Sequence, residues 1–406
     1  MASSNETIEA HEPVLSFRPA TLAVHVDDRF ALTTDVAPPM HVSTTYRYPS
    51  DPDELVPVAD EDLDISTAPF IYSRLASPNT NRFEAILSSL LGARALSYGS
   101  GLAAFHAMMV YFRPNVIAIG EGYHGCHGIL GILTRLYGLK KVTLDNEAEW
   151  DAAGLGKGDI VHVETPLNPT GEAVNLAKYR ELASKRGALL TVDATFGPPG
   201  LQDPFALGAD VVMHSGTKYF GGHSDMLCGV LATKNDEWFK GLFTERLFLG
   251  ATMGNLESWL GTRSLRTLEL RVGRQSQNAE KLVAWLDELM TGNQSGDGEV
   301  VRASVEKVQH ASLQKEDIHW IKKQMPGGYG PVFSLWAKTP EIARRLPSKL
   351  KLFHHATSLG GVESLVEWRR MSDQTVDERV VRVSVGVENW EDLRDDLLNA
   401  FKALVQ

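Results

Sequence analysis

Between residues 83 and 215 the chain alternates helix-length amphipathic segments with short apolar runs, and this alternation limits the folds open to it. FEAILSSLLG (83–92) and LAKYRELASKRG (176–187) have the spacing of helices and end at glycine. The β-prone runs are VIAIG (116–120), DIVHVET (159–165), ALLTVDA (188–194) and ADVVMH (209–214). The pattern predicts an α/β domain with a mainly parallel central sheet, whose functional residues gather at the carboxyl ends of the strands.

A chain of 406 residues exceeds the usual limit for one hydrophobic core, so we expect more than one domain. Residues 1–65 are expected to form an extended N-terminal arm, because they contain turn-like stretches and an acidic, proline-containing loop. Residues 66–275 form the predicted large α/β domain. Residues 276–406 contain further strand-like runs and a closing amphipathic helix, and they predict a smaller C-terminal α+β domain.

Charge and cysteine content argue against several classes of protein. The formal net charge of −11 disfavours nucleic acid or an anionic membrane as the main partner. The two cysteines, Cys126 and Cys228, provide neither a disulfide framework nor clustered metal ligands, so no metal site is expected. No run of roughly eighteen apolar residues occurs, and the first residues do not resemble a secretory leader. We therefore expect a cytoplasmic protein that acts on small molecules.

One lysine lies in an unusual setting, the segment HSGTKYFGGHSD (214–225). Lys218 follows a strand-like run and stands among small hydroxylated residues and glycines. Lysine amines form Schiff bases with carbonyl compounds, and a site that desolvates the amine makes its reactive neutral form more abundant. The segment therefore indicates a catalytic lysine, although a solvated structural role accounts for most lysines.

Neighbouring strand ends carry the groups that pyridoxal 5'-phosphate needs. Asp193 ends a predicted strand, where its carboxylate could keep a pyridine nitrogen protonated. Ser100 and Gly101 open an apolar helical segment, whose free N–H groups and dipole favour a phosphate. Ser215 and Thr217 could add hydroxyl donors. Each residue alone has a simpler interpretation as a helix or turn cap, but together they predict a site for this cofactor.

These residues and further motifs resemble, in sequence order, the trans-sulfuration (Cys/Met metabolism) family of pyridoxal-phosphate enzymes, which includes cystathionine γ-synthases and γ-lyases. The landmarks are YSR (72–74), PNT (78–80), SGLAA (100–104), ETPLNPT (164–170), VDATF (192–196), HSGTKY (214–219), TRSLRTL (262–268), SLGGVESL (358–365) and VRVSVGVE (381–388). The resemblance covers the chain from about residue 40 onward. It implies the fold-type I architecture, a homodimer as the minimal active unit and a tetramer as the usual assembly.

The resemblance also implies a role for each matching position. Lys218 would be the Schiff-base lysine, and Tyr123 would stack on the cofactor ring and act as an acid or base. The implied cofactor-binding residues are Lys218, Asp193, Thr195, Ser100, Gly101, Leu102, Ser215, Thr217, Tyr123, Asn168, Tyr72 and Arg74, the last two acting on the neighbouring subunit's phosphate. The implied substrate-binding residues are Ser358, Arg382, Asn168 and Thr357. Without the resemblance, a core tyrosine and a surface ion pair would be the simpler interpretations of Tyr123 and Arg382.

The resemblance implies proton removal from Cα of an amino-acid substrate, followed by loss of a group from Cγ. Thr357 stands where enzymes acting on cystathionine commonly have Glu, and Trp368 and Arg369 belong to a segment that replaces the usual one. These departures resemble a fungal-type subgroup of cystathionine γ-synthase-like enzymes. They favour γ-replacement on an activated homoserine, such as O-acetyl-L-homoserine, by a sulfur or carbon nucleophile as co-substrate. The alternative is γ-elimination, which yields 2-oxobutanoate and ammonia.

Overall fold

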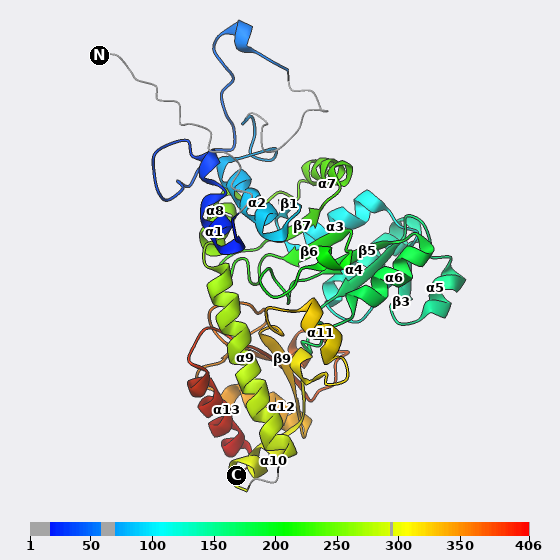
Figure 1. The fold of residues 1–406 in the computed structure, drawn as a ribbon, viewed down its shortest axis with the longest axis vertical. Helices are drawn as coiled ribbons and strands as arrows, with labels where there is room; N and C mark the ends of the chain where they lie inside the picture. Colours follow the sequence, from blue (N-terminus) through cyan, green and yellow to red (C-terminus); the bar gives the residue numbers. More distant parts are fainter. Residues whose placement is uncertain (1–16, 58–69, 293–294, 406) are drawn as a thin grey trace.

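The computed structural model describes residues 17–57, 70–292 and 295–405. Its largest sheet has seven strands in the order β1-β7-β6-β5-β4-β2-β3 (Figure 1). The strands are β1 (Arg94–Tyr98), β2 (Val116–Ile119), β3 (Lys140–Thr143), β4 (Ile160–Glu164), β5 (Leu189–Asp193), β6 (Val211–Ser215) and β7 (Gly229–Thr233). Within this described sheet only β7 runs against its neighbours, β1 and β6. The prediction of a mainly parallel sheet is therefore confirmed.

Helices cover both faces of this sheet, because alternate side chains of a strand point to opposite sides and both sides are apolar. In β2, Val116 and Ala118 join one hydrophobic cluster, and Ile117 and Ile119 join the other. One face carries α3 (Gly101–Phe112), α4 (His124–Tyr137) and α7 (Asp236–Leu249), and the other carries α2 (Pro78–Leu91), α5 (Glu147–Ala153), α6 (Leu176–Arg186) and α8 (Asn255–Leu265). This layered arrangement is the predicted α/β fold class.

The predicted elements of residues 83–215 are all present, and α2 and α6 end at the predicted glycines. The sequence analysis did not identify β1, β3 or β7, or the helices α4, α5 and α7. The long helical region after β7 and α7 consists of two helices, α8 and α9 (Leu268–Thr291). They separate because Thr267 leaves the helical conformation, with φ −116° and ψ 14°.

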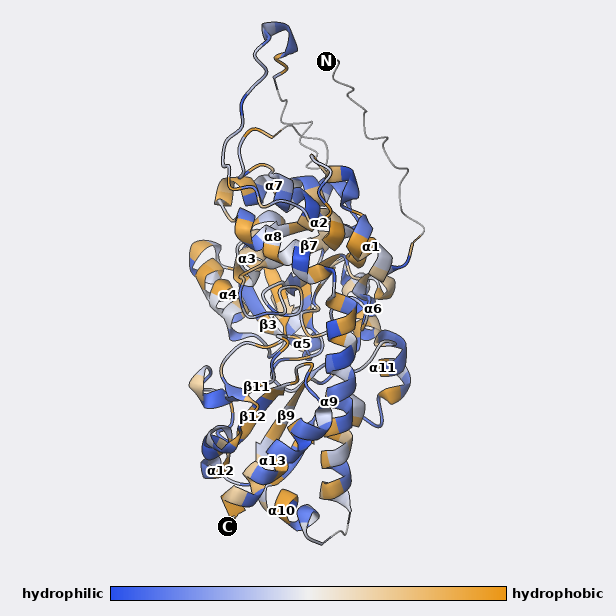
Figure 2. Cartoon of the chain, turned by 90° about the vertical axis from the view of Figure 1, so that its left-hand side faces the viewer, coloured by the Kyte–Doolittle hydropathy of each residue, from blue (hydrophilic) through white to orange (hydrophobic). Residues whose placement is uncertain are grey.

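A second sheet of five strands has the order β10-β11-β12-β9-β8. Its strands are β8 (Val305–Gln309), β9 (Val332–Ala337), β10 (His354–His355), β11 (Leu365–Trp368) and β12 (Val380–Ser384). Its helices are α9, α10 (Asp297–Ser304), α11 (Ile318–Gln324), α12 (Pro340–Arg345) and α13 (Trp390–Val405). Helices α9 and α13 share a hydrophobic cluster with this sheet, and in Figure 2 α9 carries many hydrophilic residues on the side toward the viewer.

The described part of the N-terminal region is anchored near residue 27 and projects from the body further on (Figure 1). Its first helix is α1 (Pro19–His25), and just beyond it the fully buried Asp27 binds Arg82 at 2.8 Å and Arg266 at 2.7 Å. The chain then extends outward to a short 3₁₀ turn at Pro52–Glu54. The remaining parts of the predicted arm, residues 1–16 and 58–65, lie outside the described residues.

Helix α9 connects the two sheets. Leu268 and Val272 pack in a cluster of the large sheet, whereas Ala279 and Leu282 pack in the cluster of the small sheet. The predicted boundary between residues 275 and 276 falls inside this helix, between those two groups, and we retain it as a proposal. Among the described helices, none combines the length and apolarity that crossing a bilayer requires.

Candidate active site

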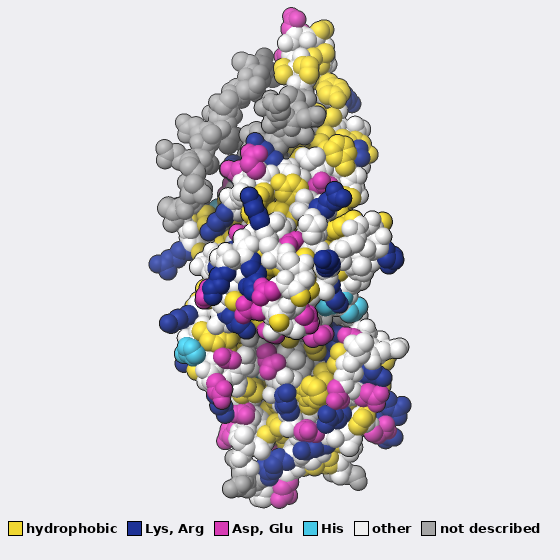
Figure 3. Space-filling model, turned by 90° about the vertical axis from the view of Figure 1, so that its right-hand side faces the viewer, with side chains coloured by type: hydrophobic (Ala, Val, Ile, Leu, Met, Phe, Trp, Pro, Cys, Tyr) yellow, Lys and Arg dark blue, Asp and Glu magenta, His cyan; other side chains and the backbone are white. Residues whose placement is uncertain are grey.

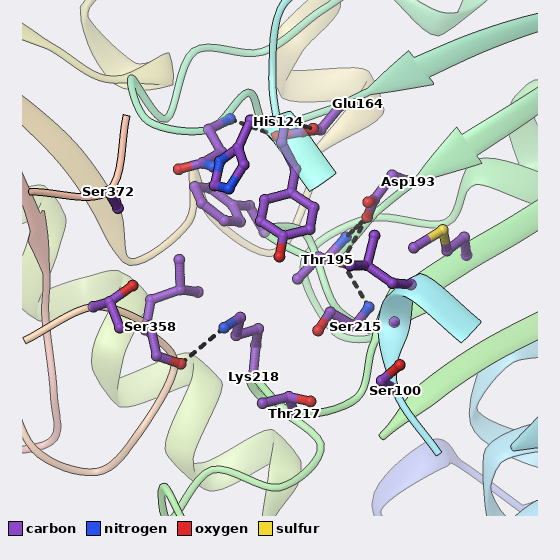
Figure 4. Close-up of a pocket in the computed structure, with 18 of the residues that line it drawn as sticks. Ser100, His124, Glu164, Asp193, Thr195, Ser215, Thr217, Lys218, Ser358 and Ser372 are labelled. Atoms are coloured by element: carbon purple, nitrogen blue, oxygen red, sulfur yellow. Dashed lines mark hydrogen bonds between the residues drawn. The ribbon is translucent and has the colours of Figure 1, made fainter. Parts of the chain in front are cut away.

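A cavity of about 570 Å³ lies where the carboxyl ends of β4, β5 and β6 meet the N-terminus of α3 and residues of the small sheet. We call it the Lys218 cavity. Every predicted site residue lines it except Tyr72 and Arg74. In Figure 4, Lys218 lies between Ser358 on one side and Asp193 on the other. The carboxyl ends of the parallel strands therefore gather the predicted groups, as expected for this fold class.

Lys218 follows β6, and its amine points into the cavity. Its Nζ donates a hydrogen bond to Oγ of Ser358 at 2.8 Å. Burial lowers the pKa of Lys218 to about 8, the positive charge of Arg382 acts in the same direction, and the negative charge of Glu367 opposes it. A substantial neutral fraction near physiological pH makes this amine suitable for attack on a carbonyl group.

Gly360 lets the SLGG turn lie directly against Lys218. Its φ is +84°, and a Cβ added there would lie 2.9 Å from the backbone carbonyl carbon of Lys218. Both facts exclude an ordinary side chain, since L-residues rarely adopt this conformation and the contact is with backbone. The glycine therefore allows Ser358, two residues earlier, to reach the amine.

A hydrogen-bonded chain on the other side of the cavity holds Asp193. The hydroxyl and backbone N–H of Thr195 both donate to Oδ1 of Asp193, and the same hydroxyl accepts from the backbone N–H of Ser215 at 2.8 Å. Burial raises the pKa of Asp193, and the Thr195 hydrogen bonds oppose that shift. Within the described residues no cation pairs with this carboxylate. A protonated ring nitrogen would therefore be a favourable partner for it.

The N-terminus of α3 forms a narrow recess beside Ser215. Ser100 caps the helix by accepting a hydrogen bond from the backbone N–H of Ala103 at 3.1 Å. A Cβ added to Gly101 would lie only 3.2 Å from the Ser215 side chain, so a larger residue would fill the recess. Helix N–H groups and serine hydroxyls suit a phosphate. The hydroxyl of Thr217 already donates to the backbone carbonyl of Cys228 at 3.2 Å.

Arg382 lies on β12, directly opposite Glu367 on β11. Its guanidinium donates to Oδ1 of Asn168 at 3.1 Å and to the backbone carbonyl of Ser358 at 2.6 Å, and it pairs with Oε2 of Glu367 at 2.7 Å. Burial lowers its pKa to about 10, which leaves it charged at neutral pH. These contacts fix the orientation of the guanidinium and leave N–H donors for a carboxylate.

Tyr123 caps α4 at the edge of the cavity, with its side chain 40% exposed. Its backbone N–H donates to Oε2 of Glu164 at 2.9 Å, and that of Asn168 donates to Oε1 at 2.7 Å. Burial, followed by the neighbouring charge of Asp193, raises the pKa of Glu164 to about 8. The shift favours the protonated form of Glu164. It holds the cavity-lining loops through backbone hydrogen bonds.

Two of the predicted cofactor-binding residues do not line the Lys218 cavity. Tyr72 and Arg74 line a separate concavity with Val42 and Asn255, and the Arg74 guanidinium lies 5.3 Å from the centre of the Tyr72 ring. Their predicted action on a neighbouring subunit therefore stays a prediction.

Cys126 is buried, and burial raises the pKa of its thiol. A reactive thiolate is correspondingly disfavoured there.

Sequence reasoning missed some of the residues that shape the cavity. Glu367 could have been found from the alternation of side chains along β11, because the residue facing Arg382 across the sheet points to the same side. Arg369, which the sequence analysis singled out in the divergent segment, lines the cavity, and so does His124 at the start of α4. Ser372 also lines the cavity and was missed, because it lies beyond the short turn η7, whose direction depends on the folded chain.

The cavity matches the separate requirements of pyridoxal 5'-phosphate. It holds a lysine amine of lowered pKa, a buried carboxylate without a cationic partner, and a recess at a helix N-terminus. Together with the mainly parallel sheet, these features define a fold-type I pyridoxal-phosphate enzyme.

Comparison with known proteins narrows this class. A family model described as "Cys/Met metabolism PLP-dependent enzyme" matches residues 20–402. The chain is 33% identical to cystathionine gamma-synthase of Escherichia coli, over 91% of this chain and 93% of that protein. It is 30% identical to cystathionine gamma-lyase of Bacillus subtilis, over 82% of this chain and 88% of that protein. Apo CalE6, a methionine gamma lyase of Micromonospora echinospora, has a similar structure, with a TM-score of 0.81 and 32% sequence identity. The match covers 95% of this chain and 99% of that chain.

The chain therefore belongs to the Cys/Met metabolism family of PLP-dependent enzymes, and its cofactor is pyridoxal 5'-phosphate. The family resemblance seen in the sequence is confirmed. The similar proteins include both synthases and lyases, so membership alone does not choose between these reactions.

Proposed function

We propose that the protein catalyses γ-replacement on an activated homoserine, such as O-acetyl-L-homoserine, with a sulfur or carbon nucleophile as co-substrate. One observation carries the amino-acid part of this proposal. Ser358 contacts both Lys218, through Oγ at 2.8 Å, and Arg382, through its carbonyl oxygen at 2.6 Å. An amino acid whose α-carboxylate binds Arg382 would thus have its Cα close to the Lys218 amine.

The protein's side chains divide the work of proton transfer and binding. The neutral amine of Lys218 removes the proton from Cα and delivers protons along the substrate chain. When bound, pyridoxal 5'-phosphate supplies the electron sink that makes this proton acidic. Asp193 favours the protonated ring nitrogen, and the α3 N-terminus binds the phosphate. Tyr123, at the cavity edge, is the proposed acid for the departing group, because burial raises its phenol pKa and keeps it protonated.

One observation supports replacement over elimination. Thr357 at the cavity mouth is neutral, so it lacks the negative charge that would attract the distal ammonium group of cystathionine. The similar synthases and lyases support both reactions equally. The alternative, γ-elimination to 2-oxobutanoate and ammonia, has support from the similar lyases.

Purified holoenzyme should be incubated with O-acetyl-L-homoserine, with and without a nucleophile, and the products identified by mass. We expect a new γ-substituted amino acid that requires sulfide, cysteine or a carbon acid. Release of 2-oxobutanoate at the same rate with or without these nucleophiles would refute the proposal in favour of elimination. Lys218→Ala should abolish both the bound-cofactor absorbance and product formation. Arg382→Gln should retain the absorbance but raise the KM for the amino acid.

We also propose that a homodimer is the minimal active unit. The arm exposes several large apolar side chains: Val36, Met40, Val42, Tyr48, Leu55 and Val56. Figure 3 shows apolar side chains gathered at the top of the view. Tyr72 and Arg74 lie at the base of the arm, away from the Lys218 cavity. Mixing inactive Lys218→Ala with inactive Arg74→Ala protein should restore activity if subunits share sites, and no recovery after verified subunit exchange would contradict this.

A further inference from the structure

Arg369 is a second arginine of the Lys218 cavity, and the proposed reaction gives it no role. It begins the short 3₁₀ turn η7 (Arg369–Met371) directly after β11, and its side chain is 5% exposed. Its Nη1 donates to Oε2 of Glu367 at 2.7 Å, the one hydrogen bond of this side chain within the described residues. Its Nε is buried without an acceptor. An unsatisfied N–H on a buried cation is costly, so an oxygen-bearing ligand would be favoured there.

Ser372 provides a second unsatisfied group in the same place. Its Oγ is buried without a hydrogen-bond partner, and its side chain lines the Lys218 cavity. The backbone N–H of Ser372 donates to the carbonyl of Arg369 at 3.2 Å, which keeps the two residues on one turn. Figure 4 shows Ser372 across the cavity from Asp193. The guanidinium and the hydroxyl thus form a pair of donors that is suited to a carboxylate.

Among the described ion pairs, Arg369 has no carboxylate to itself. Glu367 shares one oxygen between Arg369 and Arg382, so a single carboxylate faces two guanidinium groups. Burial and the charge of Asp193 raise the pKa of Glu164, which interacts electrostatically with Arg369 but forms no described ion pair with it. Asp373 is close enough to be influenced by Arg369, but its Oδ1 accepts from Thr375. A bound carboxylate would give Arg369 an acceptor that it does not share with Arg382.

We propose that Arg369 and Ser372 form a second carboxylate-binding subsite, separate from the one that Arg382 provides for the α-carboxylate. The inference rests on the proposed function and deepens it, because it specifies that one reactant carries an additional carboxylate. That carboxylate belongs either to the acyl leaving group or to the nucleophile. The neutral Thr357 on the same cavity agrees with a site that selects an anionic distal group.

Binding to the holoenzyme tests the subsite without turnover. The probes are L-2-aminoadipate, which has a distal carboxylate, and L-norleucine, which has none; both carry the α-carboxylate. By calorimetry, Arg369→Gln should weaken 2-aminoadipate about tenfold or more and change norleucine by less than about twofold. Equal weakening of both ligands, or of neither, would overturn the proposal.

Two further variants keep this test decisive. Arg370→Gln removes the same charge from the next residue, whose guanidinium pairs with Glu378 and does not line the cavity, so both ligands should bind as before. Ser372→Ala preserves all charges and should weaken 2-aminoadipate by about threefold or more without affecting norleucine. If Arg369→Gln does not fold, the ratio of the two affinities in Ser372→Ala decides, and an unchanged ratio refutes the subsite.

Steady-state kinetics then identifies which reactant carries the carboxylate. Arg369→Gln should raise the KM for O-succinyl-L-homoserine relative to O-acetyl-L-homoserine if the acyl group occupies the subsite. It should raise the KM for 3-mercaptopropanoate relative to 1-propanethiol if the nucleophile does. A KM unchanged for every reactant would overturn the role of the subsite in the reaction. A holoenzyme that binds 2-aminoadipate selectively but converts no homoserine ester would refute the proposed γ-replacement and leave the subsite standing.

Discussion

The lowered pKa of Lys218 gives a quantitative prediction for the cofactor-free protein. Burial and the charge of Arg382 lower this pKa from 10.5 to about 8. At pH 7 an amine of pKa 8 is about 9% neutral, whereas one of pKa 10.5 is about 0.03% neutral. The fold thus raises the reactive fraction about 300-fold, so imine formation should be fast at neutral pH.

The assay is stopped-flow absorbance of apoprotein mixed with pyridoxal 5'-phosphate from pH 6 to 10.5. The second-order rate constant should rise about tenfold per pH unit up to about pH 8 and then level off. Nα-acetyl-lysine amide serves as the control. Its amine has an ordinary pKa, and its reaction shows how the titrations of the cofactor itself change the rate with pH. A protein rate that keeps rising in parallel with the control beyond pH 10 would refute the reasoning. Glu367→Gln should move the midpoint below 8, since its charge raises the Lys218 pKa.

The same shift links the stability of the apoprotein to pH. Because the folded-state pKa of Lys218 is lower than the unfolded one, the unfolded chain binds more protons between pH 8 and 10.5. Lys218 therefore lowers the free energy of unfolding by its full amount below pH 8, and this effect disappears as the pH rises to 10.5. Its size is about 3 kcal/mol at most, from 2.5 units at about 1.36 kcal/mol each. Lys218→Met should remove this part of the pH dependence in urea unfolding.

Three further predictions concern the architecture of the site and the arm. Gly360→Ala should lower cofactor affinity by about tenfold or more in a spectrophotometric titration, because its methyl group meets backbone at 2.9 Å; Gly92→Ala, also at positive φ but in open space, should retain the affinity. Asp27→Ala leaves Arg82 buried without its carboxylate and should cost about 3–5 kcal/mol in urea unfolding; an unchanged midpoint would contradict this. Thr195→Val removes a hydroxyl that donates to one cavity residue and accepts from another, so cofactor affinity should fall while the unfolding cooperativity is retained.

The seven-stranded sheet was largely predictable because its signals are local. Short apolar strands and amphipathic helices are recognisable within about ten residues, and parallel strands need helical connections between them. The edge strand β1 and its neighbour β7 were not predicted. They pair over more than a hundred residues, from Arg94 to Thr233, and their apolar runs resemble helix segments as much as strands.

The sequence by itself determined the class of chemistry, because Lys218, Asp193 and Ser100 each stand at the end of a strand or the start of a helix, and such ends meet at one edge of a parallel sheet. Tertiary structure alone decided the electrostatics around them. Lys218 and its partner Ser358 are 140 residues apart, and Glu367 faces Arg382 only through strand pairing. Desolvation and charge pairing depend on which distant segments exclude water together, and no local pattern of residues encodes that.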